Sequence, residues 1–143
     1  MKRINLAISG SMGRMGQQLI KSSKKNKDFK LVTLTENRLI NKKFNGIKPE
    51  LNSNIAFKKT DVIIDFSVPE STLEILKIAS KIKNRVVIGT TGFNKVQEVQ
   101  IKKYSKKIPI LKAGNMSLGV NLLMYLTEIT SKSLSDNYLS KIF

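Results

Sequence analysis

Short apolar runs alternate along this chain with longer segments in which apolar residues recur at helical spacing. The short runs predict strands over residues 4–8, 29–35, 62–66, 86–88 and 108–111. The longer segments predict helices over residues 14–25, 69–82, 95–106 and 119–134. This alternation favours βαβ units in an α/β fold of the Rossmann type, a doubly wound, mostly parallel sheet with helices on both faces.

The predicted helices carry apolar stripes that should face the sheet. These stripes comprise Met15, Leu19 and Ile20 in the first helix, Leu73, Leu76 and Ala79 in the second, and Leu122, Leu123, Leu126 and Ile129 in the last. Pro69 suits the first turn of its helix, and Asn94 is a good cap for the next one. Residues 37–59 are polar and contain Gly46 and Pro49, so we expect a loop with a short strand near residues 55–57.

The length of 143 residues fits one domain, and no internal repeat or linker divides it. The net charge of +16 should attract polyanions such as dinucleotide phosphates, nucleic acid or an anionic membrane surface. There is no dense basic arm and aromatic residues are few, so we expect no nucleic-acid partner. We expect most of the lysines to be solvated on helix faces, among them Lys24, Lys25, Lys27, Lys102, Lys103, Lys106 and Lys107.

The chain contains no Cys and no His. These residues therefore exclude disulfides, thiolate nucleophiles, a histidine general base and Ser-His-Asp chemistry. We also expect no metal site. No apolar run approaches the roughly 20 residues that span a bilayer, and no signal peptide fits the first residues. The expectation is a cytoplasmic protein without a membrane partner.

The end of the first predicted strand carries the strongest chemical signal, the run Gly10, Ser11, Met12, Gly13, Arg14, Met15 and Gly16. A glycine-rich turn between a strand and a helix is the setting of a dinucleotide-binding loop, because the helix amino terminus offers free N–H groups to a pyrophosphate. Arg14 adds a guanidinium at the same place. Met12 replaces the middle glycine of the common G-x-G-x-x-G pattern, and a glycine turn without a ligand is the alternative.

Glu36 ends the second predicted strand, twenty residues beyond Gly16. That distance suits a carboxylate that accepts hydrogen bonds from the adenosine ribose, which would favour NAD. Arg38 and the pair Lys42 and Lys43 could instead meet the 2′-phosphate of NADP. The sequence does not decide between NAD and NADP. It is also consistent with Glu36 being a surface glutamate without a ligand.

Three further strand ends carry small and polar residues. Asp65 and Ser67 are expected to cap the helix that opens at Pro69 and to order the loop before it. Gly89, Thr90, Thr91 and Gly92 form either a ligand-binding turn or a β-turn with a helix cap. Residues 113–121 are rich in small and amide side chains, and Asn115 could bond a carboxamide or its own loop.

Four segments of the chain resemble, in order and spacing, the signature blocks of the 4-hydroxy-tetrahydrodipicolinate (dihydrodipicolinate) reductase family. These segments are residues 10–16, Asp65-Phe66-Ser67 with Pro69, residues 89–92 and residues 115–121. The first loop of that family has the form G-x-x-G-R-M-G, which accounts for Met12. The resemblance implies a reductase of lysine and diaminopimelate synthesis that passes hydride from NADH or NADPH to its cyclic substrate, and a homotetramer.

The resemblance also implies roles for individual residues. Residues 10–15 would cradle the pyrophosphate, and Glu36 would bind the adenosine ribose. Gly89, Thr90 and Thr91 would lie along the nicotinamide half of the cofactor. Ala113, Gly114, Asn115 and Met116 would border the nicotinamide ring.

The family continues into a second domain that begins with a histidine- and basic-rich segment and supplies the catalytic acid, the substrate-carboxylate ligands and much of the tetramer interface. This chain ends at residues 141–143, about where that segment is expected. We therefore expect residues 1–143 to be a dinucleotide-binding domain truncated before the substrate domain, with no catalytic residue of its own. Tyr138, Leu139, Ile142 and Phe143 are expected to begin a strand that continues into the second domain.

Three functions are consistent with these residues. The chain could be a reductase that is complete only when another chain supplies the substrate domain, a non-catalytic NAD(P)-binding module, or a basic nucleic-acid binder suggested by charge alone. A reductase needs a proton donor and cations for the substrate carboxylates, and no such cluster is found. The four loops suffice for a binding module.

Overall fold

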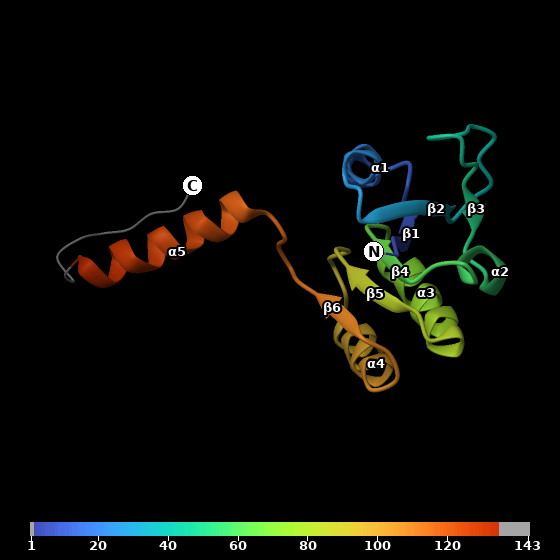
Figure 1. The fold of residues 1–143 in the computed structure, drawn as a ribbon. Coiled ribbons are helices and arrows are strands. Elements are labelled where there is room, and N and C mark those ends of the chain that lie inside the picture. Colours follow the sequence, from blue (N-terminus) through green and yellow to red (C-terminus); the bar gives the residue numbers. More distant parts are fainter. Residues whose placement is uncertain (1, 135–143) are drawn as a thin grey trace.

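The computed structural model describes residues 2–134 and contains one six-stranded sheet (Figure 1). The strands are β1 Ile4–Ser9, β2 Phe29–Glu36, β3 Glu50–Leu51, β4 Val62–Asp65, β5 Arg85–Ile88 and β6 Ile110–Lys112. The helices are α1 Arg14–Lys25, α2 Asn54–Phe57, α3 Pro69–Ile82, α4 Lys95–Ser105 and α5 Leu118–Ser133. The predicted strand that involves Tyr138, Leu139, Ile142 and Phe143 lies outside the described residues.

The strands follow the order β3-β2-β1-β4-β5-β6, and every neighbouring pair is parallel. The chain winds outward from β1 in one direction to β3, returns to β4, and then winds the other way to β6. The prediction of a doubly wound, mostly parallel Rossmann-type sheet is confirmed. The strand order reverses between β1 and β4, and in such sheets the ligand crevice forms beyond the carboxyl ends of the strands at this point.

Both faces of the sheet are covered, as predicted. Alternate residues of β1 point to opposite faces, because successive side chains of a strand alternate. Leu6 and Ile8 pack with Ile20 of α1 on one face. Ala7 belongs to the other cluster, which α2, α3 and α4 complete with Phe57, Ile75, Leu76, Ala79 and Ile101.

The segment between β2 and β4 differs from the prediction. The expected strand near residues 55–57 is wrong, because these residues form the short helix α2. The Ser53 side chain accepts a hydrogen bond from the Ala56 amide at 3.0 Å and so caps this turn, which turns Phe57 into the core. The additional strand is β3, where Glu50 and Leu51 pair with Thr35 and Glu36.

Other boundaries agree with the prediction to within two residues, and α1 begins and ends where expected. One predicted inward residue of α1 is displaced. Ile20 is buried and Leu19 packs against the core, but Met15 is 48% exposed, since the first turn of α1 stands at the open edge of the sheet.

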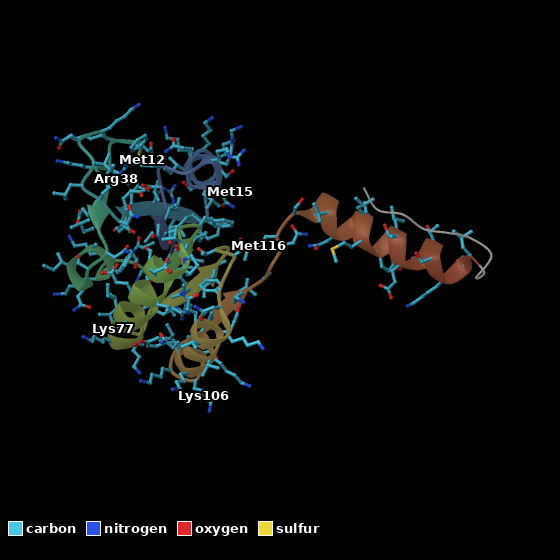
Figure 2. All side chains as sticks on the ribbon, turned by 180° about the vertical axis from the view of Figure 1, so that it is seen from behind. Met12, Met15, Arg38, Lys77, Lys106 and Met116 are labelled. Atoms are coloured by element: carbon cyan, nitrogen blue, oxygen red, sulfur yellow. The ribbon has the colours of Figure 1, made fainter. Side chains whose placement is uncertain are left out.

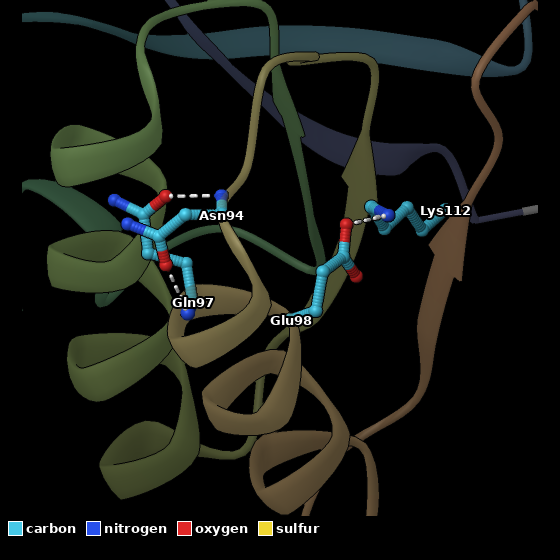
Figure 3. A network of polar contacts seen from close by, with 4 residues as sticks. All are labelled: Asn94, Gln97, Glu98 and Lys112. Atoms are coloured by element: carbon cyan, nitrogen blue, oxygen red, sulfur yellow. Dashed lines mark hydrogen bonds and ion pairs between the residues drawn. The ribbon is translucent and has the colours of Figure 1, made fainter.

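Helix α4 begins with the predicted Asn94 cap (Figure 3). The Asn94 side chain accepts from the Gln97 amide and the Gln97 side chain accepts from the Asn94 amide, both at 2.9 Å. The Lys112 ammonium lies 2.7 Å from a carboxylate oxygen of Glu98, which ties β6 to α4.

Helix α5 buries none of its residues and reaches away from the sheet (Figure 1). Its predicted apolar stripe is therefore exposed, with Leu123 64% and Leu126 50% accessible. The seven lysines expected on solvated surfaces are all exposed as well. Across residues 2–134 no helix combines the length and the apolar character needed to span a membrane.

Candidate dinucleotide site

The predicted site residues gather at one edge of the sheet, because parallel strands place their carboxyl ends together. Between the ends of β1 and β4 lies a cleft of about 210 Å³. Its lining comprises Ser9, Gly10, Gly13, Glu36, Asn37, Phe66, Ser67, Val68 and Ser71. Of these, Gly10, Gly13 and Glu36 were predicted from the sequence.

The loop from Gly10 to Gly16 is shaped by backbone contacts. Gly10 has a φ of +72°, and a Cβ there would lie 2.4 Å from the Phe66 carbonyl oxygen. A Cβ on Gly16 would lie 2.2 Å from the Gly10 carbonyl oxygen, so this glycine lets α1 approach the loop. Only glycine fits at these two positions without a backbone shift.

The amino terminus of α1 is open toward this loop. Gly13 is the N-cap residue, no side chain caps the helix, and no acidic residue occupies its first turn. The first amides of a helix need an acceptor, and an anion can supply it. Arg14 and Met12 are exposed beside this end of the helix, and Figure 2 shows Met12 and Met15 there.

Glu36 is joined to the glycine loop by two hydrogen bonds. One of its carboxylate oxygens accepts from the Met12 amide at 2.5 Å and from the Ser11 hydroxyl at 3.3 Å. Ser11 is fully buried, so its hydroxyl serves the loop and faces Glu36. The structure thus brings Glu36 to Ser11 and Met12, from which it lies 25 and 24 residues away in the sequence.

Asp65 lies fully buried at the end of β4 and accepts hydrogen bonds from Ser67, Thr72 and Thr90. Burial raises the pKa of the Asp65 carboxyl above its ordinary value, and the hydrogen bonds oppose this shift. The predicted ordering of the loop by Asp65 and Ser67 is confirmed. Their predicted role as helix caps is wrong, since the N-cap of α3 is Val68 and no side chain caps it.

The turn after β5 packs against Phe66, a residue to which the sequence analysis assigned no role of its own. A Cβ on Gly89 would lie 2.2 Å from the ring of Phe66, so this glycine makes room for the aromatic side chain. Thr90 is 5% exposed and turns its hydroxyl toward Asp65 and Ser67, whereas Thr91 is exposed. Phe66 directly follows the buried strand β4, and this position was the signal that could have identified it as a site residue.

The turn after β6 bonds to itself. Asn115 accepts from the Ser117 amide at 3.0 Å and donates to the Asn121 side chain at 2.8 Å. The sequence left open whether Asn115 bonds a carboxamide or its own loop, and in the structure its side chain bonds its own loop. Ala113, Gly114, Asn115 and Met116 do not line the cleft between β1 and β4, and they lead away from the sheet toward α5 (Figures 1 and 2).

Residues 2–134 contain no group of three or more His, Cys, Asp or Glu side chains that could hold a metal ion. Glu36, which lines the cleft, and Asp65, which is buried at the end of β4, accept hydrogen bonds from protein donors. The cleft therefore combines glycine backbone, an open helix end and the carboxylate of Glu36.

The sequence matches the family model described as "Dihydrodipicolinate reductase, N-terminus" over residues 4–116. The chain belongs to the dihydrodipicolinate reductase family. The match covers the whole sheet, from β1 to the turn after β6.

Curated relatives agree with this assignment. The chain is 75% identical, over all 143 residues, to a 4-hydroxy-tetrahydrodipicolinate reductase of Pelagibacter ubique (strain HTCC1062), and it covers 55% of that protein. It is 40% identical over 92% of its length to the reductase of the same name from Buchnera aphidicola subsp. Acyrthosiphon pisum (strain Tuc7), covering 53% of it. The chain spans about half the length of the curated relatives it matches.

Solved structures show the same fold. A dipicolinate-bound dihydrodipicolinate reductase from Paenisporosarcina sp. TG-14 has a TM-score of 0.74 at 25% identity, over 91% of this chain and 54% of that one. RSP, a Rex-family repressor, in complex with β-NADH has a TM-score of 0.66 at 13% identity, over 92% of this chain and 62% of that one. The second likeness concerns the fold alone.

Proposed function

We propose that this chain is the cofactor-binding part of an NAD(P)H-dependent 4-hydroxy-tetrahydrodipicolinate reductase. The observation that carries the proposal is the uncapped amino terminus of α1, which a glycine loop presents at the point where the strand order reverses. This is the place in a doubly wound sheet where the pyrophosphate of a dinucleotide binds. The names of the relatives supply the reaction.

The residues present fit such a ligand. Gly10 and Gly16 hold the loop close to the sheet, and the exposed Arg14 offers a cation to a phosphate. The buried Ser9 hydroxyl lines the cleft and has no hydrogen-bond partner among the described residues. A polar ligand or its water would satisfy it, since buried polar groups are usually hydrogen-bonded.

In this proposal, residues 10–15 surround the pyrophosphate, which lies at the uncapped amino terminus of α1, and Glu36 binds the adenosine ribose. Residues 89–91 lie along the nicotinamide half, and residues 113–116 border the ring. Thr90 contributes backbone groups, because its hydroxyl is engaged within the protein, and Ser11 shapes the loop through its contacts with Thr35, Gln17 and Glu36. The two halves of the ligand then lie on either side of the β1–β4 boundary.

In this proposal Glu36 favours a free 2′-hydroxyl and hence NADH, because Met12 and Ser11 hold its carboxylate beside the glycine loop, where the adenosine ribose would lie. Arg38 is exposed two residues further on and offers a cation to the 2′-phosphate of NADPH (Figure 2). The ratio of the affinities for NADH and NADPH measures whether the contact with Glu36 or the contact with Arg38 dominates.

The bound dinucleotide would supply the hydride. The reaction also requires a proton donor and cations that hold the substrate carboxylates. We assign no residue of this chain to these roles, so we expect the 143 residues alone to bind the cofactor and to turn over little or no substrate.

The test is a titration of the purified chain with NADH and with NADPH, followed by nicotinamide fluorescence at low and at moderate salt. Saturable binding that persists at moderate salt is expected. Binding of nucleic acid instead, with affinity that falls steeply with salt, would contradict the proposal. Absence of saturable binding to either dinucleotide would also contradict it.

Gly13→Asp tests the pyrophosphate position. A Cβ on Gly13 meets only the Gly10 carbonyl oxygen, at 3.3 Å, and aspartate is a favoured N-cap residue, so we expect the fold to persist. The carboxylate should repel the pyrophosphate and lower the affinity at least about 100-fold, a loss of roughly 2.7 kcal/mol. Gly13→Asn is the matched control of equal size without charge, and it should bind more tightly than Gly13→Asp.

A further inference from the structure

A buried polar cluster connects the two halves of the carboxyl edge. It consists of Asp65 at the end of β4, Ser67 in the turn that follows, Thr72 in the first turns of α3, and Thr90 in the turn after β5. Among the described residues, the hydroxyls of Ser67, Thr72 and Thr90 meet at the carboxylate of Asp65. None of them belongs to the glycine loop that carries the proposed function.

The hydrogen bonds in this cluster are distributed over both carboxylate oxygens of Asp65. Oδ1 accepts from the Ser67 amide at 3.1 Å and from the Ser67 hydroxyl at 2.5 Å. Oδ2 accepts from the hydroxyls of Thr72 at 2.5 Å and Thr90 at 3.3 Å. The Thr90 hydroxyl also accepts from the Ser67 amide at 3.1 Å, which closes a ring of contacts between the two turns.

The segment that Asp65 holds is in contact with both ligand loops. Ser67 and Phe66 line the cleft beside Gly10 and Glu36, and the Phe66 carbonyl occupies the space that a Cβ on Gly10 would need. On the other side, the Phe66 ring fills the space next to Gly89. A displacement of this segment would therefore move the walls of both loops.

A buried carboxylate without a cationic partner is costly, and apolar packing would stabilise the domain better. Within residues 2–134, the hydrogen bonds of Asp65 come from hydroxyl and amide donors only. Charge-assisted hydrogen bonds are stronger and shorter than neutral ones, so four of them on one carboxylate fix its neighbours closely. This is a reason to keep a charged residue at this position.

We propose that Asp65 is a positioning residue that couples the two halves of the dinucleotide site by holding the turn after β4 to the turn after β5. The inference rests on the proposed function, because it requires a ligand that spans both turns. Asp65 itself is fully buried and has no contact with the ligand in this proposal.

NADH and ADP distinguish coupling from simple stability. ADP carries the adenosine ribose and the pyrophosphate, and so occupies only the half at β1 and β2. NADH spans both halves. Loosening the link between the turns should weaken the binding of NADH more than that of ADP, because only NADH also reaches the turn after β5. A general loss of stability should leave the ratio of the two dissociation constants unaltered.

Thr72 is the best residue to change, because it is fully buried in α3 and does not line the cleft, and its hydroxyl donates to Asp65 and to the Val68 carbonyl in the same turn. We expect Thr72→Val to raise the ratio of the NADH to the ADP dissociation constant about threefold, and Thr72→Ser, which keeps the hydroxyl, to restore it. Thr90→Val should raise the ratio about tenfold, because it removes the direct link between the turns.

Thr60→Val is the matched control. Thr60 is also a buried threonine whose hydroxyl joins a polar network, with Phe57 and Asn84, but it precedes β4 at the opposite edge of the sheet. It should lower stability and leave the ratio as in the wild type. Calorimetric titration of each variant with NADH and with ADP measures both constants.

The outcomes separate the two proposals. If the unaltered chain binds NADH and ADP but Thr72→Val leaves their ratio at the wild-type value, the coupling is overturned and the proposed function stands. A ratio that changes equally in Thr60→Val would also overturn it. If the unaltered chain binds neither ligand, the proposed function is overturned and the coupling with it.

Discussion

Two turns of this domain carry similar sequence signals and have different structures. The turn after β1 and the turn after β6 both contain glycine and both open a helix. A Cβ on Gly16 would meet backbone at 2.2 Å, whereas nothing lies within 4 Å of the Cβ position of Gly114. Helix α1 buries Gly16, Ile20 and Ser23, while α5 buries no residue.

The difference lies in what determines each conformation. The packing of the domain determines the conformation of the first turn. The backbone of the turn after β4 leaves no room for a side chain at Gly10, and the backbone of Gly10 leaves none at Gly16. The second turn is held by hydrogen bonds among Asn115, Ser117 and Asn121, all of them within the turn and the helix it opens. Substitutions that act through packing should therefore affect the first region and spare the second.

The largest expected contrast is between two isoleucines, Ile20 of α1 at 5% exposure and Ile129 of α5 at 44%. Ile20→Ala removes a core contact and should lower the free energy of unfolding by about 2–5 kcal/mol. Ile129→Ala should change it by less than about 0.5 kcal/mol. Urea denaturation of both variants measures the contrast, and equal losses would show that α5 packs against the domain in solution.

The next contrast is between glycines. Gly16→Ala places a methyl group against the Gly10 backbone, so we expect NADH affinity to fall at least about 100-fold. The same change should lower stability by about 2 kcal/mol. Gly114→Ala meets open space and should leave the affinity within about twofold. Fluorescence titration tests both variants, and tight binding by Gly16→Ala would show that the loop does not need this close approach.

The smallest contrast is in the pH dependence of stability. Burial raises the pKa of Asp65 in the folded state, so between its ordinary value and the raised one the folded state binds more protons than the unfolded state. The contribution of Asp65 to stability is therefore full below its ordinary pKa and decreases as pH rises through the raised pKa. Asp65→Asn should remove this decrease, on the order of 1 kcal/mol.

The measurement is the difference in free energy of unfolding between the wild type and Asp65→Asn across the acidic range. Glu128→Gln on α5 is the control, because Glu128 is an exposed carboxylate paired with Lys132, with side-chain exposures of 62% and 73%. Exposed pairs contribute little, so its difference from the wild type should stay within about 0.5 kcal/mol. A flat difference for Asp65→Asn would show that the carboxylate keeps its ordinary pKa in the fold.

Much of the fold could be predicted from local patterns. The five longer strands, four of the helices, the Asn94 cap and the start of α1 all follow from apolar periodicity and capping preferences, which act over a few residues. The short helix α2 could not be predicted in the same way. Its four residues carry too little periodicity, and its conformation depends on the burial of Phe57 in the core.

Local sequence patterns are sufficient to predict the alternation of strands and helices, the glycine loop before α1 and the carboxylate at the end of β2. Long-range packing, in contrast, sets which strand ends meet, places Phe66 between Gly10 and Gly89, and brings donors from three segments, up to 25 residues away, to Asp65. The tertiary structure also decides that the apolar stripe of α5 lies exposed. Local patterns record the preference of each segment, whereas these contacts depend on the strand order, which arises from packing between distant parts of the chain.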